Sequence, residues 1–399
     1  MKVAIVGPAI TGNKGAASMV ESSIEILKKK YTTDLEIFLF SYYYKEDKTN
    51  NYLSQNLKIV KATPLYLALV INPLALLYFL LPFARGLITS LNSNIKILSE
   101  ADLVLDQGGI TFSDGRGKFL LFNIATVLPA LFMKKKVVKC AQALGPFDTS
   151  VNSFWAKRIL PKITTIVARG ENTYQNLMSL NLTNVVRGAD LAFSLEHEHS
   201  QLPNNLVYVE KEITEKTTIG ICPSVVVAKQ NENYERIIIE FVEYLVEEKK
   251  YQIILIPHSI RLDTNKTHNN DLPLTKEIYS KLSDSIKSEV ILTDMDLTAG
   301  QLRILISKCN MFIASRFHSM VSSLSTNVPV LVIGWSHKYQ EVLDMFGLKN
   351  QAIDHNDLDL EKLKFEFEKL EKKRTEVYGL INENLPSVKK VSNQHAEYF

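Results

Sequence analysis

Residues 315–331, SRFHSMVSSLSTNVPVL, place an arginine and a histidine at the start of a predicted helix. Ser315 is the predicted N-cap, and the helix is expected over Arg316–Leu324. Free backbone amides, the helix dipole and the Arg316 guanidinium together suit a phosphate or a carboxylate. His318 in the same turn would serve as a general acid or base near neutral pH. The alternative is a capping turn with a packed histidine, but two cations at the positive end of a dipole favour an anionic partner.

Further polar residues follow other predicted strands of the second half. Trp335 is of a type that stacks on sugar rings, and Lys338 adds a donor for an anion. His258 follows another strand, and we expect it beside the same site. His258, His268 and Asp271 also raise the alternative of a metal site, but their spacing along a loop is unspecific. We therefore predict no metal.

In the first half, glycine-rich turns follow the predicted strands. Gly12 and Asn13 lie in GPAITGNKGAAS, where Asn13 either contacts a ligand or caps the helix. The spacing of these glycines matches neither a dinucleotide fingerprint nor a P-loop. Gly108 and Gly109 would direct backbone amides at a ligand, and Asp114 nearby belongs either to the site or to a surface turn.

Three more polar side chains are expected at strand ends of the first half. Gln142 is predicted to end the strand that leads into AQALGPF. Arg169 follows a strand directly, which points its guanidinium at the ligand site unless it forms an ion pair with Glu171. Asp190 ends the last strand of this half. We expect Asp114 or Asp190 to be candidates for activating an acceptor hydroxyl.

The elements that position these residues follow an alternating strand and helix pattern, which indicates an α/β protein. Continuous apolar runs are typical of parallel strands that are covered on both faces. The predicted strands are Val3–Val6, Leu35–Phe40, Leu103–Leu105, Val137–Cys140, Thr165–Ala168, Val185–Val186, Ile219–Cys222, Ile253–Ile256, Val290–Leu292, Met311–Ala314 and Val330–Ile333.

Two doubly wound, Rossmann-like domains that face a cleft are the simplest organisation for this pattern. The chain turns polar between Ser194 and Thr217, so we place the N-terminal domain at 1–198 and the C-terminal domain at 217–399. The charged, helix-like stretch 358–384 is expected to pack back across both domains. With 399 residues and a net charge of +3, the chain has room for two cores, and its overall charge gives no reason to expect nucleic acid as a partner. Three scattered cysteines predict reduced thiols and a cytoplasmic location.

One apolar segment interrupts the pattern. Residues 65–83 carry no charge and approach the length of a membrane span. A single span is disfavoured because the strands on either side belong to one sheet and because Pro73 and Pro82 interrupt a straight helix. The insert, at about 62–92, is expected to be either a partly buried helical element or a hairpin that contacts the cytoplasmic face of the membrane. Basic residues near it, such as Arg85, suit anionic headgroups.

Taken together, these motifs resemble those of the polysaccharide pyruvyl transferase family. The matching pieces are GNKGAASM, DLVLDQGG, AQALGPF, VARGENT, RGADLAF, the block at 315–331 and HKYQEVLDMFGL. The resemblance covers the chain from Met1 to about Leu348, apart from the insert. It implies a GT-B-like pair of Rossmann domains that transfers pyruvate from phosphoenolpyruvate to a sugar as a cyclic ketal. Arg169, Arg316 and His318 match family positions implicated in donor binding and catalysis.

The resemblance also implies which substrates the protein would use. We expect phosphoenolpyruvate as the donor, no cofactor, and a surface polysaccharide or its lipid-linked precursor as the acceptor. Two other functions stay open at this point: a GT-B glycosyltransferase that uses a nucleotide sugar, and a non-catalytic subunit of glycan assembly. The acceptor sugar and the oligomeric state cannot be read from the sequence.

Overall fold

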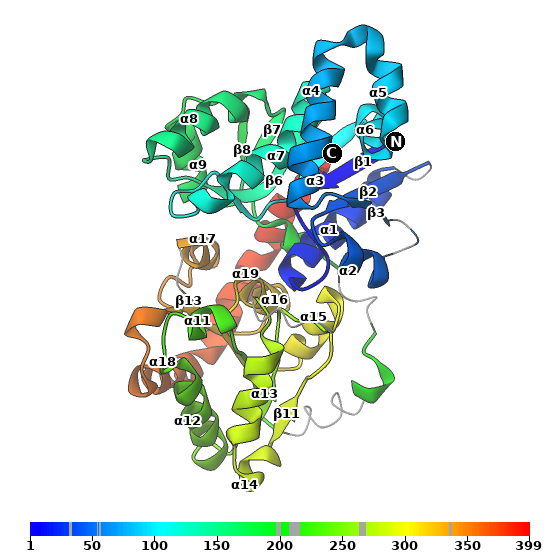
Figure 1. The fold of residues 1–399 in the computed structure, drawn as a ribbon. Coiled ribbons are helices and arrows are strands. Elements are labelled where there is room, and N and C mark those ends of the chain that lie inside the picture. The colour runs from blue at the N-terminus through cyan, green and yellow to red at the C-terminus, as the bar shows by residue number, and fades with distance from the viewer. Residues whose placement is uncertain are drawn as a thin grey trace. The chain divides into compact units, whose positions relative to one another are not determined.

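The computed structural model describes residues 1–31, 34–53, 55, 57–196, 201–206, 216–262, 269–334 and 337–399 (Figure 1). These residues form two compact units. The first comprises Met1–Thr11, Ala16–Ser194 and Lys390–Phe399, and the second comprises Gly12–Gly15 and Leu195–Lys389. The C-terminal helix thus returns the last residues of the chain to the first unit, whereas the domain limits given above stay a prediction.

A parallel sheet with the order β3-β2-β1-β4-β6-β7-β8 forms the core of the first unit, and the short β5 pairs with β6. This order reverses between β1 and β4, as in a doubly wound fold. The strands are β1 (Lys2–Val6), β2 (Glu36–Ser41), β3 (Leu57–Lys61), β4 (Leu103–Asp106), β5 (Ile110–Thr111), β6 (Lys136–Leu144), β7 (Thr165–Ala168) and β8 (Val185–Arg187).

Helices connect these strands, as parallel pairing requires. They are α1 (Lys14–Lys30), α2 (Tyr44–Thr49), α3 (Pro64–Tyr66), the π-helix η1 (Leu67–Ile71), α4 (Asn72–Leu80), α5 (Arg85–Leu91), α6 (Ser93–Glu100), α7 (Leu120–Phe132), α8 (Ser150–Ile159), α9 (Glu171–Met178) and the C-terminal α20 (His395–Tyr398). Short 3-10 turns are η2 (Pro82–Ala84), η3 (Gly117–Phe119), η4 (Leu160–Lys162) and η5 (Leu191–Ser194).

The second unit repeats the architecture around a parallel sheet of order β11-β10-β9-β12-β13-β14. Its strands are β9 (Thr218–Cys222), β10 (Gln252–Leu255), β11 (Val290–Leu292), β12 (Met311–Ala314), β13 (Val330–Gly334) and β14 (Ala352–Asp354). Its helices are η6 (Asn204–Leu206), α11 (Val225–Ala228), α12 (Tyr234–Glu247), α13 (Leu272–Lys281), α14 (Asp284–Lys287), α15 (Ala299–Ser307), α16 (Phe317–Ser325), α17 (His337–Met345), η7 (His355–Asp357), α18 (Leu360–Lys372) and α19 (Arg374–Asn393).

The predicted α/β class and parallel sheets are confirmed, and each predicted strand lies on an observed one. Three short or partly exposed strands were not predicted. β3 lies at the edge of its sheet and alternates buried residues with exposed lysines, so it lacks the continuous apolar run of a central strand. β14 is an edge strand of three residues, and β5 pairs only with β6.

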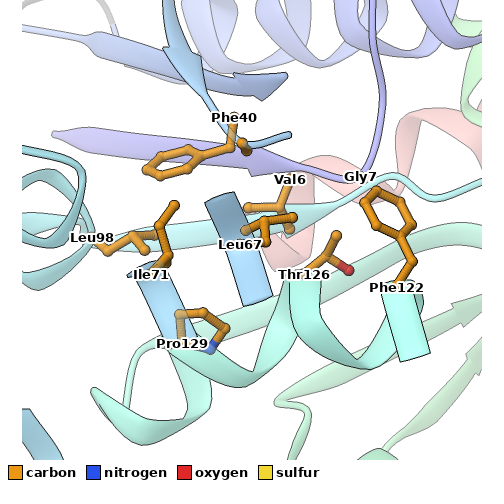
Figure 2. Close-up of a pocket in the computed structure, with 10 residues that line it drawn as sticks. Val6, Gly7, Phe40, Leu67, Ile71, Leu98, Phe122, Thr126 and Pro129 are labelled. Carbon is orange, nitrogen blue, oxygen red and sulfur yellow. The ribbon is translucent and has the colours of Figure 1, made fainter. Parts of the chain in front are cut away.

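The apolar insert forms helices α3 to α5 of the first unit. Leu67, Ile71 and Ala75 are buried in the main apolar cluster of that unit. A small apolar pocket lies beside them (Figure 2), and its walls come from the ends of β1 and β2, from the insert, from Leu98 of α6 and from α7. No charged side chain lines this pocket, so it does not suit an anionic donor. Among the described residues, no single helix is both long and apolar enough to cross a membrane.

Candidate active site

The carboxyl ends of three neighbouring strands lie at one edge of the second sheet. β9 pairs with β10 on one side and with β12 on the other, at the point where the strand order reverses. Ligands of doubly wound sheets bind at such a switch point, where the loops that leave adjacent strands diverge. The strands are followed there by Ser224, His258 and Arg316.

The turn after β12 differs from the prediction by one residue. The helix begins at Phe317, and the extended backbone of Arg316 (φ −123°, ψ 138°) makes it the capping residue. The predicted N-cap role of Ser315 is therefore wrong. Its hydroxyl is buried and accepts a 2.7 Å hydrogen bond from the hydroxyl of Tyr234, because a buried tyrosine hydroxyl requires a partner. His318 keeps its predicted place in the first turn of α16.

Arg316 is held by a fully buried carboxylate, that of Asp271. The guanidinium Nε lies 2.9 Å from Asp271 Oδ2, Nη2 lies 2.5 Å from Oδ1, and Nη1 donates a 2.6 Å bond to the side chain of Asn269. The same carboxylate accepts 3.0 Å bonds from the backbone amides of Val225 and Ser259. Asp271 thus ties together the segments that follow β9, β10 and β12.

This ion pair fixes both the charge and the direction of Arg316. Burial acts to lower the pKa of Arg316, but the charge and hydrogen bonds of Asp271 outweigh it and raise that pKa. The bonds to described residues use Nε, one N–H of Nη1 and one of Nη2, and a guanidinium has five N–H groups. Because 16% of the side chain is exposed, its remaining N–H groups suit a ligand anion.

His318 packs against Gly15 in the first turn of α1, and residues Gly12–Gly15 belong to the second unit. A Cβ atom added at Gly15 would lie 1.9 Å from Nδ1 of His318, so only glycine allows this contact. The imidazole also packs edge-on against Phe317, with ring centroids 4.9 Å apart. Asn13 accepts a 3.1 Å bond from the amide of Gly15, and the positive φ of Gly12 (+78°) favours glycine there.

His258 is buried at the end of β10, and basic side chains surround it. Burial lowers its pKa well below the usual value, and neighbouring positive charges lower it further. The imidazole is therefore neutral near pH 7. The charges that act on it come from His318, Arg316, Lys14 and Arg303.

Two of these cations have a carboxylate partner of their own. Lys14 Nζ lies 2.5 Å from Asp296, as Arg316 lies against Asp271. Such pairs hold the cations in place. Basic groups that act on a neutral imidazole, beside the free N-terminus of α16, favour an anionic ligand over a neutral one.

Lys338 lies beside this site, whereas Trp335 falls outside the described residues. The ammonium of Lys338 lies 5.0 Å from the ring centroid of Phe317 and 5.2 Å from that of Tyr339. Cation–π contacts of this kind orient the ammonium without neutralising it. His268 of the alternative metal site also lies outside the described residues, and Asp271 is engaged by Arg316.

Arg169 of the first unit is almost fully buried and pairs with Asp190 instead of Glu171. Its Nη1 lies 3.5 Å from Asp190 Oδ2. Glu171 pairs instead with Arg187, at 2.8 Å. Burial and the nearby charge of Arg169 lower the pKa of Arg116. The positive charges of these two arginines therefore act on each other within the first unit.

Gln142 lies inside β6, because that strand extends to Leu144 and pairs there with β5. Its amide donates to Asp106 Oδ1 at 2.8 Å, and its oxygen accepts a 2.5 Å bond from Thr111. Asp106 also forms a buried 2.5 Å ion pair with Lys139. The prediction that Gln142 ends the strand is therefore wrong, and its polar atoms are bound within the protein.

The two adjacent glycines, Gly108 and Gly109, follow β4 and are partly exposed. The amide of Gly108 donates a 3.1 Å bond to the side chain of Asp106. A Cβ at Gly7 would lie 3.0 Å from the nitrogen of Gly108, so the two turns approach closely through backbone. This close approach explains why glycine follows both β1 and β4.

Asp114 is hydrogen-bonded at the start of α8. Its carboxylate accepts 2.6 and 3.0 Å bonds from the amides of Asp148 and Thr149, a 2.5 Å bond from the Thr149 hydroxyl and a 3.0 Å bond from Asn152. Slight burial acts to raise its pKa, but these hydrogen bonds lower it overall. A carboxylate with a lowered pKa is a weak base, and these bonds give Asp114 a structural role before α8.

Comparison with known proteins identifies the family of the chain. A family profile described as polysaccharide pyruvyl transferase matches residues 13–337. The chain belongs to the polysaccharide pyruvyl transferase family. It is also similar to the amylovoran biosynthesis protein AmsJ of Erwinia amylovora, with 23% identity over 377 residues that cover 89% of this chain and 88% of the relative.

Solved structures support the GT-B-like fold of this family member. The UDP-GlcNAc 2-epimerase of Neisseria meningitidis, bound to UDP-GlcNAc, superimposes with a TM-score of 0.61 at 15% identity, covering 100% of this chain and 99% of that one. The UDP-GlcNAc 2-epimerase of Methanocaldococcus jannaschii gives 0.58 at 15% identity, covering 92% of each chain. At this identity the likeness concerns the fold alone.

The structure also brings in residues that were not predicted for the candidate site of this family member. Asp271 and Asn269 hold Arg316, and Lys14 and Arg303 act on His258. The sequence NNDLP at 269–273 carries a signal for Asp271, since a polar cluster before a proline at the start of a helix marks a capping segment. Its pairing with an arginine 45 positions away has no local signal.

Proposed function

We propose that this pyruvyl transferase moves pyruvate from phosphoenolpyruvate onto two hydroxyls of a sugar as a cyclic ketal. The observation that carries the proposal is Arg316, fixed by Asp271 at the N-terminus of α16 with His318 in the first turn of that helix. A compact dianion or trianion that bears a phosphate and a carboxylate suits such a site.

The proposed reaction uses groups with separate tasks. A proton adds to the methylene carbon of phosphoenolpyruvate while one sugar hydroxyl attacks the central carbon and gives up its proton. The bond from that carbon to the phosphate oxygen then breaks, and phosphate leaves with the bonding electrons. The second hydroxyl adds to the same carbon, loses its proton and closes the ketal. His318 is the proposed acid and base, because it is the titratable group in the turn beside Arg316.

The arginines are the proposed electrostatic partners of the donor. Arg316 would bind the phosphate or carboxylate and stabilise the charge that builds on departing phosphate. We propose that Arg169 and the ammonium of Lys338 bind the same anionic groups of phosphoenolpyruvate. Asp190 is less suited as an acceptor base because it is buried and paired with Arg169.

The proposed acceptor is a sugar of a surface polysaccharide or of its lipid-linked precursor. Two loops supply proposed contacts to the acceptor: the loop after β1, with Gly12 and Asn13, and the loop after β4, with Gly108 and Gly109. His258 and Trp335 are further proposed contacts to the acceptor. A precursor carried on a lipid would bring the reaction to the cytoplasmic face of a membrane.

Ligand-induced thermal stabilisation tests the donor. A donor present at 100 times its dissociation constant stabilises the fold by about 2.7 kcal/mol. We expect a rise in the unfolding temperature with phosphoenolpyruvate and none with UDP-, GDP- or CMP-sugars. The rise is expected to disappear in Arg316→Ala and to persist in Arg236→Ala, a control at an exposed ion pair on α12.

The alternative functions predict other results. Stabilisation by a nucleotide sugar alone would indicate a glycosyltransferase. A non-catalytic subunit would give two results. The protein would bind the donor but release no phosphate with any acceptor glycan, and the Arg316→Ala variant would leave the cellular polysaccharide unchanged.

A further inference from the structure

The helical insert of the first unit exposes an apolar face. Surface helices of water-soluble proteins bury one apolar stripe and turn polar residues outward. Here the stripe of Leu67, Ile71 and Ala75 is buried, but the outward residues are also apolar. Leu69 is 72% exposed and Leu80 is 57% exposed. A contiguous apolar surface of this kind marks an interaction site.

The exposed residues continue around a hairpin. The helical stretches Pro64–Leu80 and Pro82–Leu91 together are apolar enough for a membrane span, but they are bent by 117°. Phe83, at the bend, is 87% exposed, and Leu87 of α5 is 65% exposed. Figure 1 shows α4 and α5 as the two arms of this hairpin, and the two helices contact each other.

The hairpin is held firmly to the first unit. α4 packs on α7, and α5 packs on α6. Asn72 donates 2.9 Å bonds to the carbonyls of Leu67 and Ala125, which ties the start of α4 to α7. The exposed apolar surface is therefore presented by a supported element.

The charged residues of the hairpin and of its flanking segments are basic up to Glu100, which ends α6 and lies 4.0 Å from Lys96. No acidic residue occurs in 62–99 or in 115–147. Arg85 on α5, Lys96 on α6 and Lys118 just before α7 are exposed. Arg85 lies over the ring of Tyr78, with its guanidinium carbon 4.9 Å from the centroid, and donates a 3.1 Å bond to the carbonyl of the same residue. Arginine and tyrosine together are typical of the headgroup level of a membrane.

We infer that this hairpin docks on the surface of an anionic lipid bilayer, with Phe83 and the neighbouring leucines at the boundary between headgroups and acyl chains. The bend excludes a straight span, and an interfacial element needs to insert only about 5–10 Å. A second copy of the chain suits this surface less well, because a two-fold contact would place its cations against the same cations. The inference adds a docking surface to the proposed transferase.

Vesicle flotation of the full chain, without donor or acceptor, tests the inference. We expect the wild type to float with phosphatidylglycerol-containing vesicles and far less with phosphatidylcholine alone. Replacing three exposed residues, Leu80→Ser with Phe83→Ser and Leu87→Ser, is expected to lower the partition coefficient at least about tenfold. The matched control replaces exposed apolar residues elsewhere, Val151→Ser with Phe154→Ser and Phe365→Ser, and should float like wild type.

Charge variants give a second readout. Neutralising Arg85, Lys96 and Lys118 to glutamine is expected to weaken binding to anionic vesicles about fivefold for each cation and to flatten its salt dependence. Thermal unfolding of every variant checks that the fold is intact. Failure of the wild type to float, or equal flotation of the triple serine variant, would overturn the inference.

Light scattering tests whether a second copy of the chain, and not a membrane, covers this surface. A dimer in solution that the triple serine variant dissociates, without vesicle binding by the wild type, would assign the face to a second copy. Because the flotation assay contains no phosphoenolpyruvate, its failure leaves the proposed reaction standing, and failure of the donor assay leaves the docking surface standing.

Discussion

The ion pair between Asp271 and Arg316 offers the sharpest test of how the site is built. Asp271→Asn removes one charge and keeps the size of the side chain. The change leaves the guanidinium buried without its counter-charge. It also turns an amide group toward the backbone N–H of either Val225 or Ser259, where only an acceptor fits. Breaking a buried pair in this way costs about 3–5 kcal/mol.

The exposed fraction of Arg316 places the cost at the lower end of that range. With 16% of its side chain exposed, water screens part of the lost interaction, and we expect about 3 kcal/mol. For a unit of this size that corresponds to a fall of roughly 6–12 °C in the unfolding temperature. Scanning calorimetry measures it. Asp284→Asn is the matched control, since its fully exposed carboxylate lies 3.9 Å from Lys287, and we expect a change below about 0.5 kcal/mol.

A double variant separates charge pairing from packing. Asp271→Asn combined with Arg316→Met removes both charges and is expected to recover at least about 1 kcal/mol relative to Asp271→Asn alone. Transferase activity should fall at least tenfold in Asp271→Asn although Arg316 is intact, because the guanidinium loses its fixed direction. Additive losses in the double variant, or a single variant as stable as wild type, would refute the reasoning.

Three further predictions follow from particular contacts. Gly15→Ala forces His318 to move and should cost about 1–3 kcal/mol and most of the transferase activity, whereas Gly86→Ala, at an open position, should not destabilise the fold in the same thermal and activity assays. Burial lowers the pKa of His395 to about 4. As the pH falls, His395 is therefore protonated in the unfolded chain at a higher pH than in the folded protein. The folded state should then lose about 3 kcal/mol as the pH falls from about 6.5 to 4, and urea titrations should show a shallower acid slope in His395→Gln; an unchanged slope would contradict this. Asp114→Ala should cost about 1–2 kcal/mol through the lost hydrogen bonds to the residues before α8 and leave kcat within about threefold, and a larger drop in kcat would restore Asp114 as a base.

Part of the fold and of the site could be predicted because its signals are local. Central strands such as β7 and β12 were placed correctly since burial on both faces demands continuous apolar runs. The turn after β12 was recognised because arginine and histidine directly follow such a run. The edge strand β3 was missed, because its exposed side tolerates lysines and removes that signal.

The sequence by itself therefore determined the α/β class, the central strands, and the membership of Arg316 and His318 in one turn at a strand end. Tertiary structure alone decided which polar groups meet. Asp271 reaches Arg316 across 45 positions, and Gly15 faces His318 across a far longer stretch. No periodicity encodes such pairs, since strand order and loop closure bring them together. Tertiary burial likewise drew Ser315 to Tyr234 and away from the helix cap that its residue type favours.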